Sequence, residues 1–336
     1  MPSKMNETIL EIKDLKVHFA FTKGIAKKQI GTVKAVDGVS FSVDKGKTVG
    51  IVGESGCGKT TTGKAILRMV SSSGGKIYFH SEEVLSMKRK DHDKIKRNMQ
   101  MIFQDPYGSL DPRQSAFSII KEVLTADGKK RTPKEVKDEV DKLLVMVGLS
   151  EEMGERYPHE LSGGQRQRIG IARALACHPE VIICDEPVSA LDVSIQAQII
   201  NLLQNLQDTL GLTYVFVAHD LAVVRHIADQ VCIMYLGNIV ETMDSDEMFT
   251  NPLHPYTMAL ISAIPLVDYH LEKSRKRIEL EGEIPSPINR PSGCPFHPRC
   301  PYVTDKCKNE TSFLEEAGEN HMVSCFNFRS LNKDHK

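Results

Sequence analysis

Short stretches near the start of the chain have the polarity pattern of β-strands with one buried face. Apolar and polar residues alternate from Ile9 to Phe19, and we expect this strand to end at Phe19. The alternation returns from Val39 to Val43, and Lys76 to Phe79 is predicted as another short strand. Between the first two strands, Lys23 to Lys34 is expected to be a basic loop.

Other stretches are apolar at nearly every position, as in strands buried on both faces of a parallel sheet. The predicted buried strands are Thr48–Val52, Met99–Phe103, Val181–Asp185 and Thr213–Ala218. Nearer the C-terminus, Val231–Tyr235 and Asn238–Thr242 are separated by Leu236 and Gly237 and predict a hairpin.

Helix-like stretches separate these strands. We expect helices at Thr61–Val70, Lys88–Arg97 and Arg166–Ala176, and further helices from Ser115 to Leu149. In that region the residues spaced as one apolar helix face are Val136, Val140, Leu143, Leu144 and Val147. An all-helical insertion in an alternating pattern predicts an α/β fold with a helical subdomain at about residues 105–165.

Composition narrows the possible classes of protein. The 336 residues are 40% hydrophobic and 26% charged, which is ordinary for a globular protein with more than one domain. A net charge of −1 gives no basic field for nucleic acid. No apolar run approaches the roughly 20 residues that cross a bilayer, and the N-terminus lacks a secretory signal. We therefore expect a cytosolic chain, or one bound to the cytosolic face of a membrane.

A phosphate-binding loop is predicted where the first buried strand ends. Gly53-Glu54-Ser55-Gly56-Cys57-Gly58-Lys59-Thr60 matches G-x-x-x-x-G-K-[ST], and Thr61 continues into the expected helix. The loop's N–H groups and the helix N-terminus would face phosphate oxygens. Lys59 would reach the β- and γ-phosphates, and Thr60 would offer its hydroxyl to Mg²⁺. A glycine-rich turn is the alternative, which the strand–loop–helix context disfavours.

Polar side chains follow the other buried strands. Asp185 would hold Mg²⁺, and Glu186 would activate a water for attack on the γ-phosphate. Gln104 could reach a metal ion or a water, although it could equally be an ordinary strand end. His219 could sense or polarise the γ-phosphate. Asp192 lies in the segment Ser189–Asp192, which follows the carboxylate pair.

A second anion site is predicted at Leu161-Ser162-Gly163-Gly164-Gln165, before an expected helix. A serine with two glycines at a helix N-terminus suits a phosphate. The alternative is an N-cap followed by a flexible turn, which accounts for Ser162 but requires neither both glycines nor Gln165.

The last part of the chain is rich in proline and cysteine. Nine of the 16 prolines follow residue 250, and four of the eight cysteines, Cys294, Cys300, Cys307 and Cys325, fall in the last 43 residues. We expect this loop-rich region to bury little core and to need a staple. Four thiolates suit zinc or an iron–sulfur cluster, with unligated thiols as the remaining possibility. His297 could replace a cysteine in a zinc site.

Together these motifs resemble the nucleotide-binding subunit of an ATP-binding-cassette (ABC) transporter over about residues 5 to 250. The resemblance identifies residues 53–60 as Walker A, Gln104 as the Q-loop, residues 161–165 as the LSGGQ signature, Val181–Asp185 as Walker B, Glu186 as the general base, Ser189–Asp192 as the D-loop, His219 as the switch histidine and Phe19 as the adenine-stacking residue. It implies a P-loop NTPase fold, with a RecA-like core, an antiparallel β subdomain and a helical subdomain.

Three segments narrow the resemblance. Residues 103–110, 157–161 and 251–257 are similar to the ATPases of oligopeptide and dipeptide permeases, and the loop at 23–34 is similar to their F-type subunit. The resemblance implies a cassette at residues 1–250 and a C-terminal extension at 251–336. It also implies a [4Fe–4S] cluster on the four C-terminal cysteines.

The resemblance further implies how such a subunit works. Ser162 and its glycines complete the ATP site of a facing subunit, here a D-type ATPase, so that binding closes the dimer and hydrolysis opens it. Two membrane permeases and an extracellular peptide-binding protein would complete a peptide importer. Nickel, glutathione or antimicrobial-peptide systems use similar ATPases. Soluble ABC ATPases of DNA repair or translation are less well matched, because the chain has one cassette and no long coiled coil.

Overall fold

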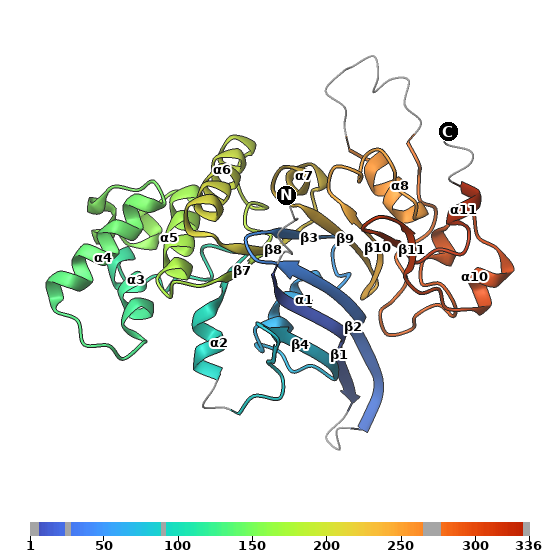
Figure 1. Ribbon diagram of the computed structural model, residues 1–336, viewed down its shortest axis with the longest axis horizontal. Helices are drawn as coiled ribbons and strands as arrows, with labels where there is room; N and C mark the ends of the chain where they lie inside the picture. Colours follow the sequence, from blue (N-terminus) through green and yellow to red (C-terminus); the bar gives the residue numbers. More distant parts are fainter. Residues whose placement is uncertain (1–6, 24–27, 89–91, 265–276, 332–336) are drawn as a thin grey trace, which may run out of the picture. The chain divides into compact units, whose positions relative to one another are not determined.

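The computed structural model describes residues 7–23, 28–88, 92–264 and 277–331. The chain forms two compact units, and Figure 1 labels their helices and strands. The first unit contains Val43–Thr48 and Ser86–Ala218, with the start of the chain up to Thr8. The second unit contains Ile9–Ser42, Val49–Leu85 and the chain from His219 onward. Each is described by itself.

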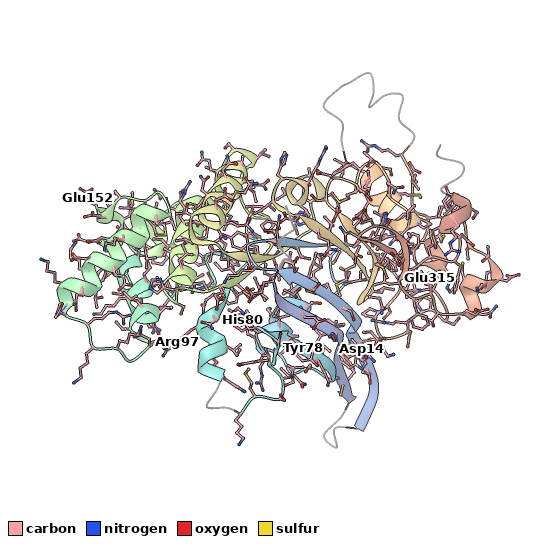
Figure 2. The ribbon with its side chains drawn as sticks, in the orientation of Figure 1. Asp14, Tyr78, His80, Arg97, Glu152 and Glu315 are labelled. Atoms are coloured by element: carbon pink, nitrogen blue, oxygen red, sulfur yellow. The ribbon has the colours of Figure 1, made fainter. Side chains whose placement is uncertain are left out.

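An antiparallel sheet in the second unit has the strand order β2-β1-β4-β5. Its strands are β1 (Thr8–Lys23), β2 (Lys28–Asp44), β4 (Gly74–Phe79) and β5 (Glu82–Glu83). The register of β1 with β4 shifts between Lys13 and Lys16, where Asp14 has a φ of +48°. Its N–H donates to Ser40 Oγ at 2.8 Å, which stabilises this bulge. Figure 2 labels Asp14 and Tyr78 on this sheet.

The prediction of a loop at Lys23–Lys34 is wrong for most of that segment. β1 continues past Phe19 to Lys23, and β2 already begins at Lys28, while residues 24–27 lie outside the described residues. Side chains at positions 19–21 are exposed, so these residues are in a strand without burying a face. Backbone pairing requires no apolar alternation, and the sequence pattern therefore missed the extension.

A second set of strands in this unit has the order β11-β12-β10-β9-β3. Its members are β3 (Thr48–Val52), β9 (Gln230–Tyr235), β10 (Asn238–Asp244), β11 (Glu315–Gly318) and β12 (His321–Val323). β3 is parallel to β9, with Gly50 opposite Val231, whereas β9 and β10 form the predicted antiparallel hairpin. A Cβ at Gly50 would overlap Val224 of α7 (Leu221–Ile227), so glycine allows α7 to approach the strand.

The first unit contains three parallel strands in the order β8-β7-β6. They are β6 (Met99–Ile102), β7 (Val181–Asp185) and β8 (Thr213–Ala218), and the last two have the predicted bounds. Their buried apolar side chains explain why the sequence located them reliably. The unit's sheet-associated helices include α2 (His92–Asn98) and α6 (Val193–Leu210).

Helices also form the predicted insertion of the first unit. They are α3 (Ala116–Thr125), α4 (Pro133–Met146) and the short 3₁₀ segments η2 (Glu151–Glu155) and η3 (Pro158–Glu160). α5 (Gly163–Leu175) follows them. A reciprocal capping box between Thr132 and Glu135 begins α4. The predicted apolar residues of α4 and its end are all buried, which confirms that stripe.

The C-terminal region is better packed than expected. It contains α8 (Pro255–Ser262), η4 (His297–Arg299), α10 (Asp305–Asn309), β11, β12 and α11 (Phe328–Leu331). The rings of Tyr235, Tyr256 and Phe296 lie 4.7–5.4 Å apart between centroids, and all three are fully buried. Leu253, Val323 and Phe328 form a further buried cluster within the region. The expectation of little core was wrong because these elements pack on β9 and β10 as well as on one another.

Glu241 of β10 fixes the start of this region. Its buried carboxylate accepts hydrogen bonds from the N–H groups of Leu253 (2.6 Å) and His254 (3.0 Å). The ring of His321 in β12 lies 2.8 Å from the same carboxylate. One buried acid therefore joins three segments that are distant in sequence.

Across the described ranges, no helix combines the length and apolarity that a bilayer span requires.

His254 should make stability depend on pH. Burial lowers its pKa to about 3, and its Nδ1 accepts from the N–H of Tyr256 at the start of α8. Between that pH and its ordinary value of 6.5, the unfolded chain binds a proton that the folded chain excludes. The contribution of neutral His254 to the free energy of unfolding is fully present above about pH 6.5. It is lost as the pH falls toward the pKa of His254 in the folded chain.

We predict that His254→Asn, which keeps a capping acceptor, removes up to about 1.4 kcal/mol per pH unit from the slope of stability between pH 4 and 6. The measurement is the midpoint of urea unfolding across that range. His159→Asn, at an exposed histidine, is the matched control. An unchanged slope in His254→Asn would contradict the burial argument.

Candidate functional site

The loop from Gly53 to Thr60 joins β3 to α1 (Lys59–Ile66) in the second unit. A Cβ at Gly53 would overlap the carbonyl oxygen of Met234, and one at Gly58 would overlap that of Ala35. Gly58 also has a φ of +110°, which L side chains rarely adopt. The glycines are therefore required by the packing of the loop against neighbouring backbone as well as by its curvature.

Lys59 lies buried across its own loop. Its ammonium donates to the carbonyl oxygens of Gly53 (2.7 Å) and Glu54 (3.1 Å), and only 4% of the residue is exposed. Thr60 and Thr61 occupy the first turn of α1, while Ser55 and Gly56 are exposed. The loop thus combines exposed backbone with a buried cation, an arrangement that can receive phosphate.

In the first unit, strand register brings Gln104 and Glu186 together. β6 and β7 are parallel with Ile102 opposite Cys184, so the residues two positions beyond each pair also meet. Gln104 Nε2 donates to the Glu186 carboxylate at 3.0 Å. Asp185, directly before Glu186, is only 3% exposed at the end of β7.

The backbone at Glu186 is unusual. Its φ is +44°, a conformation that is costly for a residue other than glycine. Its N–H donates to Val217 of β8 at 2.9 Å, and its carbonyl accepts from the Ser189 hydroxyl at 3.1 Å. These contacts hold the backbone of Glu186 in this conformation directly after the strand.

The second predicted anion loop is a helix cap. Ser162 Oγ accepts from the Gln165 N–H (3.3 Å), and Gln165 Oε1 accepts from the Ser162 N–H (2.9 Å). α5 therefore begins at Gly163, three residues before the predicted start, because a capping box fixes its first turn.

The two signature glycines have packing partners in their own chain. A Cβ at Gly163 would lie 3.2 Å from Leu191, and one at Gly164 only 2.7 Å from Ile195 of α6. Asp192 is exposed at the N-cap of α6. Sequence reasoning missed this reason for the glycines, which depends on how closely two helices approach each other.

Phe19 and His219 belong to the second unit. Phe19 is 43% exposed on β1, and the ring of the preceding His18 lies 2.9 Å from the carboxylate of Asp37. His219 is exposed and directly follows β8. Phe19 is thus accessible, as a stacking residue must be.

The four C-terminal cysteines lie within electrostatic reach of one another. Burial, together with the neighbouring Cys300, Cys294 and Cys307, raises the pKa of Cys325 to about 12. Burial likewise raises the pKa of Cys300 to about 11. Among the described residues, no group of three or more His, Cys, Asp or Glu side chains is arranged to hold a metal ion.

Sequence reasoning also missed the partners of Glu54. Arg299 and Tyr256 contact this loop residue from more than 200 positions away. No local pattern marks these pairs, because they depend on contacts between segments that are distant in the sequence.

The two units together carry the elements of an ABC ATPase cassette. The family described as "ABC transporter" matches residues 36–189, and the family described as "Oligopeptide/dipeptide transporter, C-terminal region" matches residues 240–307. Among solved structures, the dimeric post-hydrolysis ATP-binding cassette MJ0796, bound to ADP and Pi, aligns with a TM-score of 0.63 at 26% identity, covering 70% of this chain and 99% of that one. cbiO1 from Clostridium perfringens aligns with a TM-score of 0.62 at 27% identity, covering 72% and 91%.

Similarity to curated proteins identifies the family of ABC ATPases more closely. The chain is 50% identical to the oligopeptide transport ATP-binding protein AppF of Bacillus subtilis, over 97% of this chain and 99% of that protein. It is 51% identical to the oligopeptide transport ATP-binding protein OppF of Escherichia coli, over 95% and 96%. The dipeptide transport ATP-binding protein DppF of Haemophilus influenzae is 46% identical over 96% and 98%. The chain belongs to this family of oligopeptide and dipeptide transport ATP-binding proteins.

We predict that Gly58→Ala destabilises the protein more than Gly56→Ala does. Both positions have positive φ, but only the added methyl at Gly58 meets backbone, while the space at Gly56 is open. The extra cost should be about 1–3 kcal/mol, measured as a lower thermal midpoint. Equal midpoints for the two variants would contradict the close approach to Ala35.

Proposed function

We propose that the chain is an ATP-hydrolysing subunit that powers peptide import through an ABC transporter. The observation that carries the proposal is its near full-length similarity to oligopeptide and dipeptide transport ATP-binding proteins. We assign residues 1–250 to the cassette, with the helical subdomain at about 105–165, and residues 251–336 to the C-terminal extension.

The loop residues Gly53–Thr60, with Thr61, would bind the triphosphate. Lys59 would turn from the loop carbonyls toward the β- and γ-phosphates, and Phe19 would stack on the adenine. Oxygen ligands suit Mg²⁺, so Thr60, Asp185 and Gln104 fit that ion chemically. Mg²⁺ would neutralise charge on the phosphates.

Glu186 would act as the general base. Its carboxylate accepts the proton of a water whose oxygen attacks the γ-phosphorus, and the bond to the β–γ bridging oxygen breaks to give ADP and phosphate. Gln104 supports this role, because its amide donates to that carboxylate and can orient it. His219 would polarise the γ-phosphate.

Ser162, Gly163, Gly164, Gln165 and Asp192 would complete the ATP site of a facing cassette. The N-terminus of α5 is a suitable end for such an anion, because its dipole favours negative charge. A dimer is supported by the similar cassette MJ0796, whose structure is dimeric with ADP and Pi bound. We propose a D-type ATPase of the same importer as the partner.

Two membrane permeases and an extracellular peptide-binding protein would complete the importer, with this chain at the cytoplasmic face of the membrane. The exposed surface at residues 104–113, which includes Tyr107, would pass ATP-driven motion to a permease. The ligand would be selected by these partners, since this chain carries the motor.

We propose further that Cys294, Cys300, Cys307 and Cys325 bind a [4Fe–4S] cluster, with zinc as the alternative. The donor set fits, since the four thiols lie within electrostatic reach of one another. Burial raises the pKa values of Cys294, Cys300 and Cys325, so cluster or metal binding would release their protons. Binding would draw these thiols closer, because the described residues do not form a ready-made ligand group. A bound cluster or zinc ion would cross-link the segments of the C-terminal region.

We predict that Glu186→Gln binds ATP but traps the closed dimer, with turnover reduced at least about 100-fold because the base is lost. Cells that produce only this variant should also fail to take up labelled oligopeptide. Glu152→Gln, an exposed glutamate labelled in Figure 2, is the matched control. Unchanged turnover would remove Glu186 from the base role, whereas lost turnover with normal uptake would reject peptide import as the purpose of hydrolysis.

We predict that anaerobically purified protein is brown, with broad visible absorbance and iron and sulfide in equal amounts. Cys325→Ser should bleach this absorbance because a ligand is removed, whereas Cys177→Ser, outside the group, should not. A colourless protein with stoichiometric zinc would decide for zinc, and a metal-free one for unligated thiols.

A further inference from the structure

Arg299 of the C-terminal region forms a two-point ion pair with Glu54 of the phosphate-binding loop. Its Nη1 and Nη2 donate to the two carboxylate oxygens at 2.8 and 3.1 Å. The arginine side chain is only 8% exposed and the glutamate side chain 24%. The hydrogen bonds to Glu54 raise the pKa of Arg299, so the guanidinium stays charged. A bidentate pair of this kind fixes orientation as well as distance.

The backbone of Glu54 is held from the same region. Its N–H donates to the hydroxyl of Tyr256 at 2.9 Å, and Tyr256 is fully buried in α8. The Tyr256 ring packs against Phe296, three residues before Arg299. Because the Glu54 carbonyl accepts from Lys59 Nζ at 3.1 Å, fixing Glu54 also fixes the lysine of the loop.

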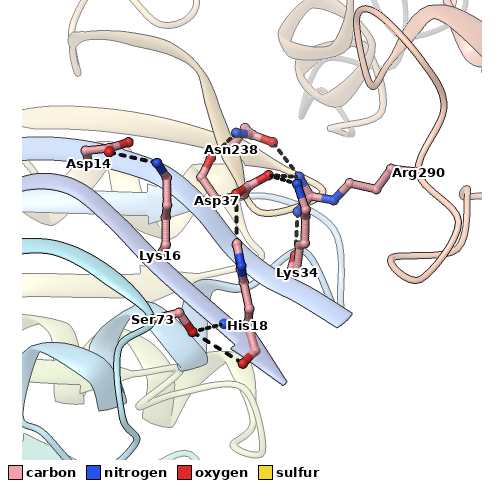
Figure 3. Close-up of polar contacts among 8 residues, drawn as sticks. All are labelled: Asp14, Lys16, His18, Lys34, Asp37, Ser73, Asn238 and Arg290. Carbon is pink, nitrogen blue, oxygen red and sulfur yellow. Dashed lines mark hydrogen bonds and ion pairs between the residues drawn. The ribbon is translucent and has the colours of Figure 1, made fainter. Parts of the chain in front are cut away.

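A second arginine reaches the other end of the loop indirectly. Arg290 Nη1 donates to Asp37 (3.0 Å) and to Asn238 Oδ1 (3.1 Å), and Nη2 donates to the carbonyl of Lys34 (Figure 3). The Asp37 N–H donates to the Gly237 carbonyl at 2.8 Å, and the Gly237 N–H donates to the Cys57 carbonyl at 2.8 Å. Two backbone hydrogen bonds therefore connect Asp37, which Arg290 contacts, to Cys57 of the loop.

Asp37 is a strong anchor for Arg290. Burial alone would raise its pKa, but hydrogen bonds from His18 and Lys34 and the charge of Arg290 outweigh burial and leave the pKa lowered. Figure 3 shows His18, Lys34 and Arg290 converging on this carboxylate. Asp37 is thus ionised at neutral pH and holds the arginine by charge.

We propose that residues 290–299 clamp the phosphate-binding loop at both ends, and that Arg299 and Arg290 are positioning residues for ATP. This inference rests on the proposed function. The loop must order its backbone N–H groups before phosphate binds, and the clamp supplies that order in advance. The C-terminal region is then part of the nucleotide-binding apparatus, in addition to any role with a membrane partner.

The test is a double-mutant cycle in the full chain, using Arg299→Gln, Glu54→Gln and both together. Arg299→Gln should weaken ATP binding about 10- to 100-fold through misplacement of the loop. The double variant should be no weaker than the worse single variant, because one interaction has been removed. Arg290→Gln should act in the same direction, and Arg299→Lys should fall between Arg299→Gln and the unsubstituted chain, because one point of contact remains.

Arg329→Gln is the matched control, since Arg329 is an exposed arginine of the same region. Hydrogen exchange of the peptide spanning residues 50–60, without nucleotide, is the second readout and should rise in Arg299→Gln and Arg290→Gln but not in Arg329→Gln. Normal ATP affinity and normal exchange in the clamp variants would overturn the inference, as would additive effects in the cycle. A lower thermal midpoint with unchanged affinity would mean that the arginines only hold the C-terminal region in place.

If the unsubstituted chain fails to bind ATP, the proposed function fails. If it binds and the clamp variants bind equally well, only the inference fails. Glu54→Gln keeps the arginine and the fold of the C-terminal region, so the cycle can still be interpreted if Arg299→Gln folds poorly.

Discussion

The close approach of the phosphate-binding loop to neighbouring backbone is the constraint on which the second unit depends. Gly53 and Gly58 face carbonyl oxygens of Met234 and Ala35 with no space for a Cβ. A side chain at either position would push the loop off β9 or β2 and move the carbonyl oxygens that hold Lys59. The motif is therefore a requirement of packing as much as of phosphate chemistry.

The C-terminal region contacts the same phosphate-binding loop. Glu241 ties its beginning to β10 and β12, while Tyr256 and Arg299 tie it to Glu54. A region that is poor in regular helices is stabilised because it extends an existing sheet and fills an aromatic cluster beside it. Its contacts with the loop give this extension a place in the nucleotide-binding unit.

In the first unit, single residues serve folding and chemistry together. β6 and β7 pair as parallel strands, and their register also places Gln104 next to Glu186. The capping box of Ser162 and Gln165 starts α5 and at the same time exposes a helix N-terminus. Close packing against α6 accounts for the glycines of that loop. Each proposed catalytic group is held by an element whose folding has its own local cause.

The amino-acid sequence alone determined the buried strands β7 and β8, the strand–loop–helix setting of Lys59 and the apolar face of α4, because each depends on a pattern within a few residues. It also located the candidate residues, whose roles stay predictions. Tertiary structure decided the extension of β1 beyond Phe19, the burial of the C-terminal region and the pairing of Arg299 with Glu54 across 245 positions. Such features depend on strand pairing and on which surfaces meet, and these contacts leave no periodic trace in the sequence.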